Sequence, residues 1–196
     1  MQPQTFIFFG PSGSGKGTQA KLLVEKLRAK DPDRKILYLE TGQKFREFAT
    51  HASYTAQKTK AIIESGGLMP EFLPVWIWTQ YFVDHISGDE HIILDGVSRR
   101  AHEALIIDSA MRFYERQSPF VISIELSPES AIKRMEKRGR VDDNEEEIKK
   151  RIAWYEENVV PAINYFKNNP YYKFVSVNGE GSIEEVHQEI LKKLYM

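Results

Sequence analysis

The fold is decided by one stretch near the start of the chain, Gly10-Pro11-Ser12-Gly13-Ser14-Gly15-Lys16-Gly17-Thr18. It directly follows the apolar run Thr5–Phe9 and precedes a helical pattern over residues 19–27. Glycines and small side chains let consecutive backbone N–H groups point inward around an anion, and the following helix adds its positive N-terminus. Lys16 can then reach the β- and γ-phosphates of a nucleotide as a point charge. The stretch therefore predicts a phosphate-binding loop, or P-loop.

Five short apolar runs, each followed by a loop and a longer helical pattern, organise the rest of the chain. Because strands with few polar residues are buried on both faces, this alternation predicts a parallel sheet covered by helices on both sides. The expected fold class is therefore α/β, the three-layer fold of P-loop NTPases with a five-stranded parallel sheet. Ser127 before Pro128, and Ser182 three residues before Glu185, mark two helix starts. The predicted strands are Thr5–Phe9, Lys35–Glu40, His91–Leu94, Phe120–Leu126 and Lys173–Val177.

Length and composition limit the class of protein. The chain has 196 residues, and 27 Lys and Arg against 28 Asp and Glu give a net charge of -1. We therefore expect a single domain over residues 1–196, with no bulk field that attracts nucleic acid or an anionic membrane. The count of cysteine is zero, which excludes disulfides, thiol catalysis and thiolate-built zinc sites. We expect a cytoplasmic protein with no zinc and no targeting or membrane-spanning segment.

The segment between the second and third predicted strands is about fifty residues long, far more than one crossover needs. It reads as several helices broken at residues 65–67 and at Pro70. We therefore expect a helical subdomain inserted at residues 41–70. The Trp- and Phe-rich helix expected over residues 71–87 is assigned to the core.

The third predicted strand is followed by Asp95 and Gly96. Because the carboxyl ends of parallel strands meet at one edge of the sheet, Asp95 is expected beside the P-loop, where its carboxylate can hold Mg²⁺ directly or through water. The strict P-loop pattern has Ser or Thr directly after the lysine, whereas here Gly17 precedes Thr18, so ligation of Mg²⁺ by the Thr18 hydroxyl is not predicted. The expected cofactor is Mg²⁺ bound with ATP, with Asp95 contacting it through water.

Six arginines lie near the expected carboxyl ends of the strands or at helix ends close to them. Phosphoryl transfer between two nucleotides needs several fixed cations, because donor and acceptor phosphates repel each other and the transferring group spreads charge over its oxygens. One arginine would suffice for hydrolysis, so the pattern favours transfer to a phosphorylated acceptor. The six are Arg46, Arg99, Arg134, Arg138, Arg140 and Arg151.

From residue 5 to the C-terminus the chain resembles the adenylate kinase family of nucleoside monophosphate kinases. Gly-Thr follows the P-loop lysine, as in that family. Thr41-Gly42 with Arg46 is similar to its acceptor-phosphate motif, and Asp95-Gly96-Val97-Ser98-Arg99 stands where the family has Asp-Gly-Phe-Pro-Arg. Arg140-Val141-Asp142-Asp143-Asn144 and Arg151 complete the pattern. The resemblance implies reversible transfer of the γ-phosphoryl group of ATP to a nucleoside monophosphate, with AMP as the expected acceptor.

The resemblance also implies roles for individual residues. It assigns ATP binding to Gly13, Ser14, Gly15, Lys16, Gly17, Thr18, Arg134, Arg138 and Gly181, the last through its carbonyl to the adenine. It assigns monophosphate binding to Thr41, Arg46, Gly67, Leu68, Met69, Gly96, Arg99, Glu103, Arg140 and Arg151. The implied catalytic residues are Lys16, Arg99, Arg138, Arg140 and Arg151. The insert becomes the acceptor-binding subdomain, and the lid shrinks to residues 138–140, so closure relies on helix-end motion.

Three features depart from the family pattern, and one of them is the lid, which is shorter than in the family's short-lid members because only Gly139 separates Arg138 from Arg140. Val97-Ser98 replaces Phe-Pro, which alters the stiffness of the loop but keeps its arginine. The family's adenylate kinases have Gln four residues after that arginine, where it reads the acceptor adenine, and this chain has Glu103. A carboxylate accepts from the adenine amine but cannot donate to the neighbouring ring nitrogen, whereas it suits the two donors of guanine. Alternatively, Glu103 is an ordinary acid on a helix surface.

Other functions stay open at this point. A UMP/CMP or GMP kinase of the same fold is favoured by Glu103, and a non-enzymatic nucleotide sensor would bind ATP without forming ADP. A regulatory GTPase is disfavoured, because the chain has no Asn-Lys-x-Asp segment for guanine. The expected partners are ATP and AMP, with no nucleic acid and no membrane, and the expected state is a monomer.

Overall fold

The centre of the molecule is a sheet of five strands. The computed structural model describes residues 1–65, 67–138 and 145–196. The strand order is β2-β3-β1-β4-β5, and every adjacent pair is parallel. The strands are β1 Thr5–Phe9, β2 Ile36–Glu40, β3 His91–Asp95, β4 Phe120–Glu125 and β5 Lys173–Asn178. Each lies within one residue of its predicted run, which confirms the α/β class with a five-stranded parallel sheet.

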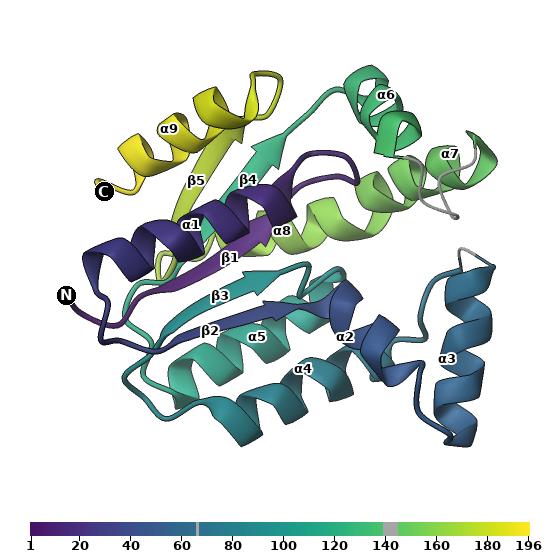
Figure 1. Ribbon diagram of the computed structural model, residues 1–196, viewed down its shortest axis with the longest axis horizontal. Helices are drawn as coiled ribbons and strands as arrows, with labels where there is room; N and C mark the ends of the chain where they lie inside the picture. The colour runs from purple at the N-terminus through teal and green to yellow at the C-terminus, as the bar shows by residue number, and fades with distance from the viewer. Residues whose placement is uncertain (66, 139–144) are drawn as a thin grey trace.

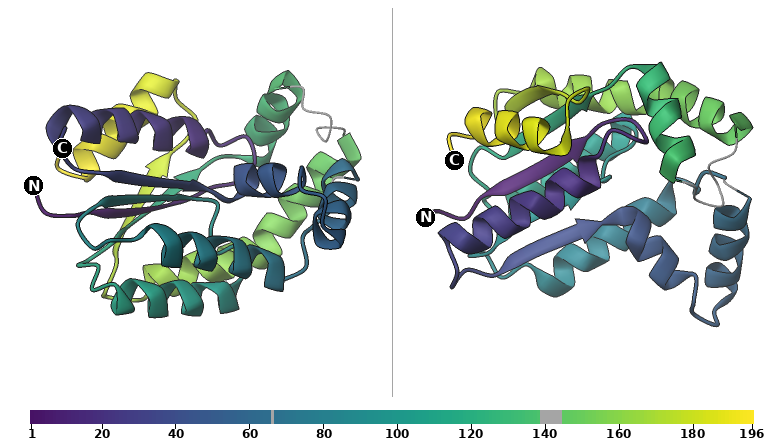
Figure 2. Two further views of the ribbon diagram at one scale, coloured as in Figure 1. Left: turned by 60° about the horizontal axis from the view of Figure 1, so that its bottom comes forward. Right: turned by 45° about the horizontal axis from the view of Figure 1, so that its top comes forward.

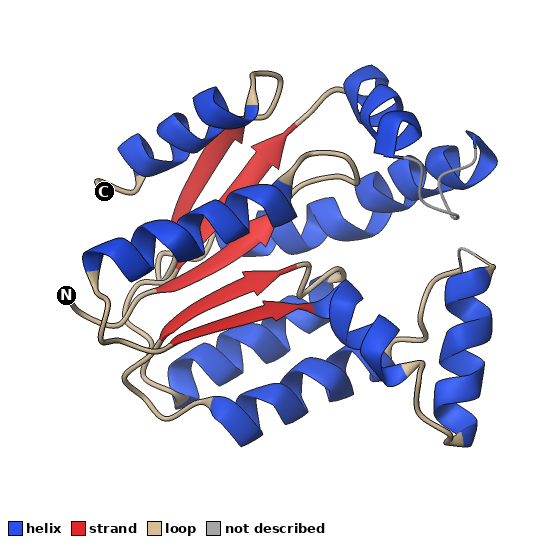
Figure 3. Cartoon of the chain, in the orientation of Figure 1, coloured by secondary structure: helices blue, strands red, loops and turns tan. Residues whose placement is uncertain are grey.

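Helices cover both faces of this sheet, as the three-layer prediction requires (Figures 1 and 3). On one face lie α1, Lys16–Lys30, and α9, Ile183–Lys193. On the other lie α4, Phe72–His85, α5, Ala101–Phe113, and α8, Val160–Lys167. The left view in Figure 2 shows the sheet between these two layers.

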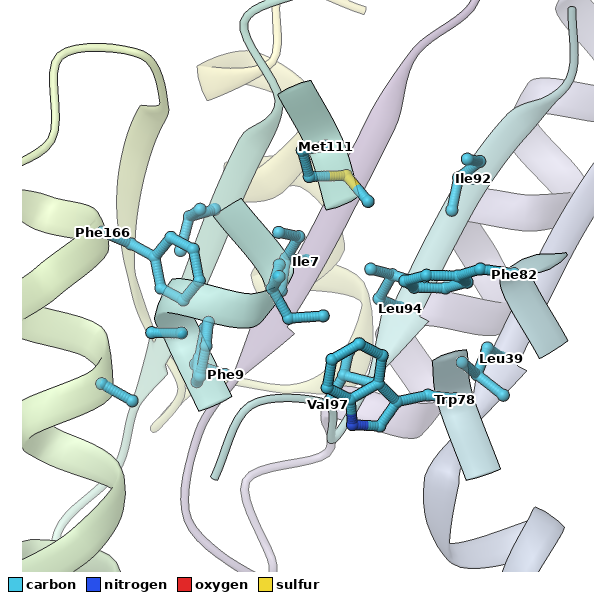
Figure 4. Packing of buried hydrophobic residues seen from close by; sticks show 14 of the residues in the cluster. Ile7, Phe9, Leu39, Trp78, Phe82, Ile92, Leu94, Val97, Met111 and Phe166 are labelled. Carbon is cyan, nitrogen blue, oxygen red and sulfur yellow. The ribbon is translucent and has the colours of Figure 1, made fainter. Parts of the chain in front are cut away.

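The side chains of β1 show how the two layers are held. Phe6 and Phe8 pack with α1 and α9, whereas Ile7 and Phe9 pack with the helices of the opposite face. Successive side chains of a strand point to opposite faces, so one run of apolar residues fills both halves of the core. Figure 4 shows the second half, where Trp78 and Phe82 of α4 pack beside Leu39 of β2 and Leu94 of β3. The helix predicted for the core therefore does pack there.

Two helices fill the segment predicted as the insert. α2, Thr41–Phe48, begins where β2 ends, and α3, Tyr54–Glu64, stands apart from the sheet (Figure 1). The Ser53 hydroxyl caps α3 by accepting from the Ala56 N–H at 3.1 Å. The role of these helices in acceptor binding stays a prediction.

The C-terminal third carries the predicted caps. α6, Pro128–Arg138, is preceded by Ser127, whose hydroxyl accepts from the Ser130 N–H at 3.2 Å. Ser182 and Glu185 form a reciprocal capping box at the start of α9. α7, Glu145–Trp154, continues through a π-helical turn, η1, Tyr155–Val159, into α8. Of the predicted lid, Gly139 and Arg140 lie outside the described residues, as do residues 141–144. No helix in the described parts of the chain is long and apolar enough to span a bilayer.

A buried charge network lies at the amino-terminal ends of β1 and β3, away from the P-loop. Arg116 is 3% exposed and donates to the Thr5 hydroxyl at 2.8 Å and to the Glu90 carbonyl at 2.7 Å. Its Nη1 lies 3.7 Å from the Glu90 carboxylate, which is also buried. The guanidinium therefore joins β1, the start of β3 and the loop after α5.

Arg116→Met is expected to lower the free energy of unfolding by about 3–5 kcal/mol, because it leaves the Glu90 carboxylate and several carbonyls buried without the cation. Urea unfolding measures this loss. Arg112→Met, which removes an arginine from an exposed ion pair on α5, is the control and should cost less than about 1 kcal/mol. Equal stability of the Arg116 variant and wild type would contradict a structural role for the network.

Candidate active site

A cleft of about 610 Å³ opens at the carboxyl ends of the strands. Ligands bind at this edge in open α/β sheets, because loops from neighbouring strands converge there. Its lining comes from the P-loop after β1, the start of α2, residues 67–69, the loop after β3, α6, α7 and η1. The cleft therefore brings together segments that are far apart in the sequence.

The P-loop has the geometry of an anion nest. Gly13 and Gly15 have φ values of 86° and 83°, a left-handed conformation that side chains disfavour. A Cβ on Gly13 would also lie 2.9 Å from the Ala131 carbonyl of α6. Gly15 caps α1 without a side chain, so the N–H groups of the first turn have no capping acceptor and are placed for an anion.

Lys16 is the first residue of α1, and its Nζ lies 3.4 Å from the Pro11 carbonyl across the loop. The ammonium therefore stands over the nest in which phosphates would bind. Ser14 lies differently, because its hydroxyl is buried under the loop and a Cβ on Gly10 would stand 2.6 Å from it. The Ser14 N–H donates to the Pro11 carbonyl at 3.1 Å, so this residue closes a turn within the loop instead of turning its polar groups toward an anion.

Asp95 ends β3 beside the P-loop, with Phe8 of β1 as its partner in the sheet register. Its side chain is nearly buried, and the Tyr38 hydroxyl donates to Oδ2 at 3.4 Å. Oδ2 also lies 3.1 Å from the place where a Cβ on Gly17 would stand. Burial raises the pKa of Asp95 above its ordinary value, and the Lys16 charge opposes the rise. The carboxylate thus lies close to the position at which strict P-loops carry a hydroxyl.

Asp95→Asn is expected to raise the Tm of the ligand-free, metal-free protein while lowering its activity. The pKa is higher in the folded than in the unfolded state, so ionised Asp95 destabilises the fold; this penalty is absent below about pH 3.8 and is complete above the folded-state pKa. Thermal unfolding between about pH 4 and 8 measures it. The gain in Tm should shrink as the pH falls, and a lower Tm for the variant at pH 7 would contradict the argument.

The segment predicted for the donor side joins α6 to the loop after β5. Arg134 donates to the carbonyls of Glu180 and Gly181 at 3.3 and 3.4 Å. The Glu180 carboxylate accepts from the Ser130 hydroxyl at 2.6 Å and the Ser127 N–H at 2.8 Å, which lowers the pKa of Glu180 to about 2. The Arg134 guanidinium therefore holds the Gly181 carbonyl, and Arg134 itself lines the cleft.

The segment predicted for the acceptor side lies across the cleft. Arg46 of α2 pairs with Glu40 at 2.9 Å, and Arg151 of α7 faces the same space. The loop that carries Arg99 is tightly turned, with φ of 72° at Gly96 and 60° at Ser98. The Arg99 Nε donates to the Gly96 carbonyl at 3.2 Å. Cations from three different elements thus surround one cavity.

Glu103 is buried, so the alternative that it is an ordinary acid on a helix surface is wrong. It is 1% exposed, and its Oε2 accepts from the Arg99 N–H at 2.7 Å. Glu103 sits in the first turn of α5, so its carboxylate reaches back to the chain that enters the helix, as in a capping box. Sequence reasoning missed this because the contact depends on the bent course of residues 96–99.

Most residues singled out from the sequence meet in this cleft. Those that line it are Gly13, Gly15, Lys16, Gly17, Thr18, Thr41, Arg46, Gly67, Leu68, Met69, Asp95, Gly96, Arg99, Glu103, Arg134 and Arg151. Ser14 and Gly181 are not among its described lining residues. Arg138 ends α6, but its side chain is outside the described part of the structure, and Arg140 lies outside it altogether.

Other residues that line the cleft were not expected. They include Lys21, Arg100, Trp154 and Tyr155. Arg100 carried a usable signal, because it follows Arg99 directly and precedes a helix. The two aromatic residues carried none, because an aromatic at the end of a charged helix reads equally well as core.

The fold and the site define a class of protein, a P-loop phosphotransferase that acts on nucleotides. A family model described as adenylate kinase matches residues 8–171. The chain therefore belongs to the adenylate kinase family, which confirms the resemblance seen in the sequence.

Individual relatives agree with the family match. The adenylate kinase of Prochlorococcus marinus is 30% identical over 188 residues, which cover 96% of this chain and 97% of that protein. The adenylate kinase of Leptospira biflexa is 30% identical over 192 residues, 96% of this chain and 98% of that protein. Adenylate kinase 1 of Nostoc sp. is 29% identical over 184 residues, 94% and 95% of the two chains. The similarity thus spans nearly the whole length of each protein.

Proposed function

We propose that the protein catalyses the reversible transfer of the γ-phosphoryl group of ATP to AMP, which yields two molecules of ADP. The observation that carries this proposal is the cleft itself, where a P-loop with Lys16 faces Arg46, Arg99 and Arg151 from other elements. A nucleotide-binding loop alone would serve many functions. A second group of cations opposite it is what a phosphorylated acceptor requires.

On the donor side, the loop formed by residues 13–18 holds the phosphates of ATP through backbone N–H groups, and Lys16 neutralises the charge on the β- and γ-phosphates. Arg134, with Arg138 as predicted from the sequence, holds the same side from α6. The Gly181 carbonyl accepts from the adenine amine. Because Arg134 donates to that carbonyl, the positions of the adenine and of the phosphates are coupled.

On the acceptor side, Arg46, Arg99 and Arg151, with Arg140 as predicted from the sequence, hold the phosphate of AMP. Thr41 and residues 67–69 surround its base and ribose. The transfer needs no covalent intermediate, because the cations position the two phosphates in line and stabilise the charge that develops between them. Closure of the helices around both substrates excludes water.

The donor set fits Mg²⁺ as the ion bound with ATP. Mg²⁺ commonly binds through one or two carboxylates, phosphate oxygens and water. Asp95 presents one carboxylate at the P-loop, and the described residues form no cluster of three or more His, Asp or Glu side chains that would hold a metal alone. Asp95 would hold Mg²⁺ through water, and the bound ion would neutralise phosphate charge. We further propose that the protein is a monomer, which sedimentation at micromolar concentration tests.

A coupled assay tests the proposal. ATP with Mg²⁺ is supplied with AMP, GMP, CMP or UMP in turn, and diphosphate formation is followed. We expect rapid ADP formation with AMP and slow hydrolysis of ATP without any acceptor. ATP binding without acceptor-dependent ADP formation would refute the function, and preference for GMP, UMP or CMP would reassign the acceptor.

A further inference from the structure

Arg100 lies where the acceptor segment, the core and α7 meet. Its Nη2 is 3.4 Å from the Met69 carbonyl, its Nη1 is 3.5 Å from the Glu103 Oε1, and its Nε is 3.6 Å from Glu71. The guanidinium also lies over the Trp154 ring, 5.4 Å from its centroid. Its side chain is only 16% exposed, yet it lines the cleft.

The length of these contacts matters. A guanidinium has five N–H donors, and ordinary N–H···O hydrogen bonds are about 2.7–3.2 Å long. With the described residues, every polar contact of the Arg100 guanidinium is 3.4 Å or longer. A largely buried cation that makes only long contacts retains donor capacity for a ligand in the same cleft.

Glu103 shows the complementary property. Its Oε2 is committed to the Arg99 N–H at 2.7 Å, whereas its Oε1 has only the 3.5 Å contact with Arg100 among the described residues. Glu103 lines the cleft, and only its Oε1 therefore retains acceptor capacity for a ligand there. That arrangement disfavours the paired donors of guanine, which the carboxylate alone would suit.

We propose that Arg100 and Glu103 together recognise the base of the acceptor, an inference that rests on the proposed function. Arg100 donates to the ring nitrogen N1 of adenine, and the Glu103 Oε1 accepts from the neighbouring 6-amino group. Adenine presents an acceptor beside a donor at this edge, so one side chain that only donates and one that only accepts complement it. Arg100 thereby supplies the donor that a carboxylate lacks.

Analogues of AMP that differ by one atom or group test each half of the pair. In 1-deaza-AMP a CH group replaces N1, and in purine riboside monophosphate the 6-amino group is absent. With the wild-type enzyme and saturating ATP, each analogue is expected to raise KM about 10- to 100-fold relative to AMP, the effect of losing a hydrogen bond to a charged group. A KM for 1-deaza-AMP equal to that for AMP would overturn the role of Arg100, and an equal KM for the deaminated analogue would overturn that of Glu103.

The variant Arg100→Met separates recognition from a structural role. It should raise the KM for AMP about as much as the loss of N1 does, about 10- to 100-fold, and should leave the KM for ATP unchanged. In this variant AMP and 1-deaza-AMP should have the same KM. If the ratio of the two KM values stayed at the wild-type level, the inference would fail.

Two further variants serve as controls for this experiment. Arg112→Met, also on α5, is the matched control and should keep the wild-type KM ratio. Arg100→Lys keeps a donor and a charge, so its ratio of the KM for 1-deaza-AMP to the KM for AMP should lie between those of wild type and Arg100→Met. A ratio for Arg100→Lys no higher than that for Arg100→Met would oppose a donor role. Absence of ADP formation from ATP and AMP in the wild type would refute the proposed function itself, whereas ADP formation with no discrimination against 1-deaza-AMP would refute only this inference.

Discussion

Lys16→Met is expected to lower kcat for ADP formation about 100- to 1,000-fold, an effect of about 3–4 kcal/mol on the transition state. Lys16 begins α1 and its ammonium lies over the P-loop. Methionine keeps the length of the side chain but removes the charge that offsets the phosphates. Because phosphate charge shifts during transfer, the loss should appear mainly in kcat. Steady-state kinetics with both substrates varied measures it.

Lys30→Met provides the comparison for this variant. Lys30 ends the same helix, is exposed, and lies one helix length away from the cleft. Its substitution should leave kcat within about twofold of wild type, with a loss of at most about 1 kcal/mol of stability at the helix C-terminus. A Lys16→Met enzyme that retained more than a tenth of the wild-type kcat would show that the P-loop lysine is dispensable.

The sheet could be predicted because its signals are local. Parallel strands are buried on both faces, so a run such as Phe6 to Phe9 is nearly all apolar and is recognisable without knowledge of its neighbours. The caps at Ser127 and Ser182 were equally local, because each hydroxyl bonds a backbone N–H three residues later. The Gly-rich loop between a strand and a helix was also a local signal, and it predicted that the ligand carries phosphate groups.

The acceptor side was less predictable, because its contacts join distant parts of the chain. Arg100 reaches the carbonyl of Met69 and the ring of Trp154, and no sequence spacing brings these three together. The burial of Glu103 depends on the positive φ values of Gly96 and Ser98, which bend the chain back over α5. The sequence showed that Glu103 departs from the family pattern; the packing showed what stands beside it.

Arg99→Met is expected to lower kcat about 1,000-fold, the effect typical of an arginine that stabilises a transferring phosphoryl group. Its guanidinium donates through Nε to the Gly96 carbonyl, and its backbone N–H donates to the Glu103 carboxylate, so both ends of the residue are held. A cation fixed before the reaction does not have to reorganise during it, which is why the loss should be large.

The stability of the Arg99 variant should hardly change, and this distinguishes a catalytic role from a structural one. The Arg99 side chain is exposed within the cleft, where water can screen its charge. Desolvation by the surrounding chain lowers the pKa of Arg99, and the carboxylates of Asp95 and Glu103 oppose this fall, so the guanidinium gains little net stabilisation from the fold. Loss of its guanidinium should therefore change the free energy of unfolding, measured by urea titration, by less than about 1 kcal/mol. Arg99→Lys should recover only part of kcat, because an ammonium keeps the charge but loses the planar fork that holds two phosphate oxygens. Full activity in Arg99→Lys would mean that charge alone is needed at this position, and full activity in Arg99→Met would remove Arg99 from the reaction.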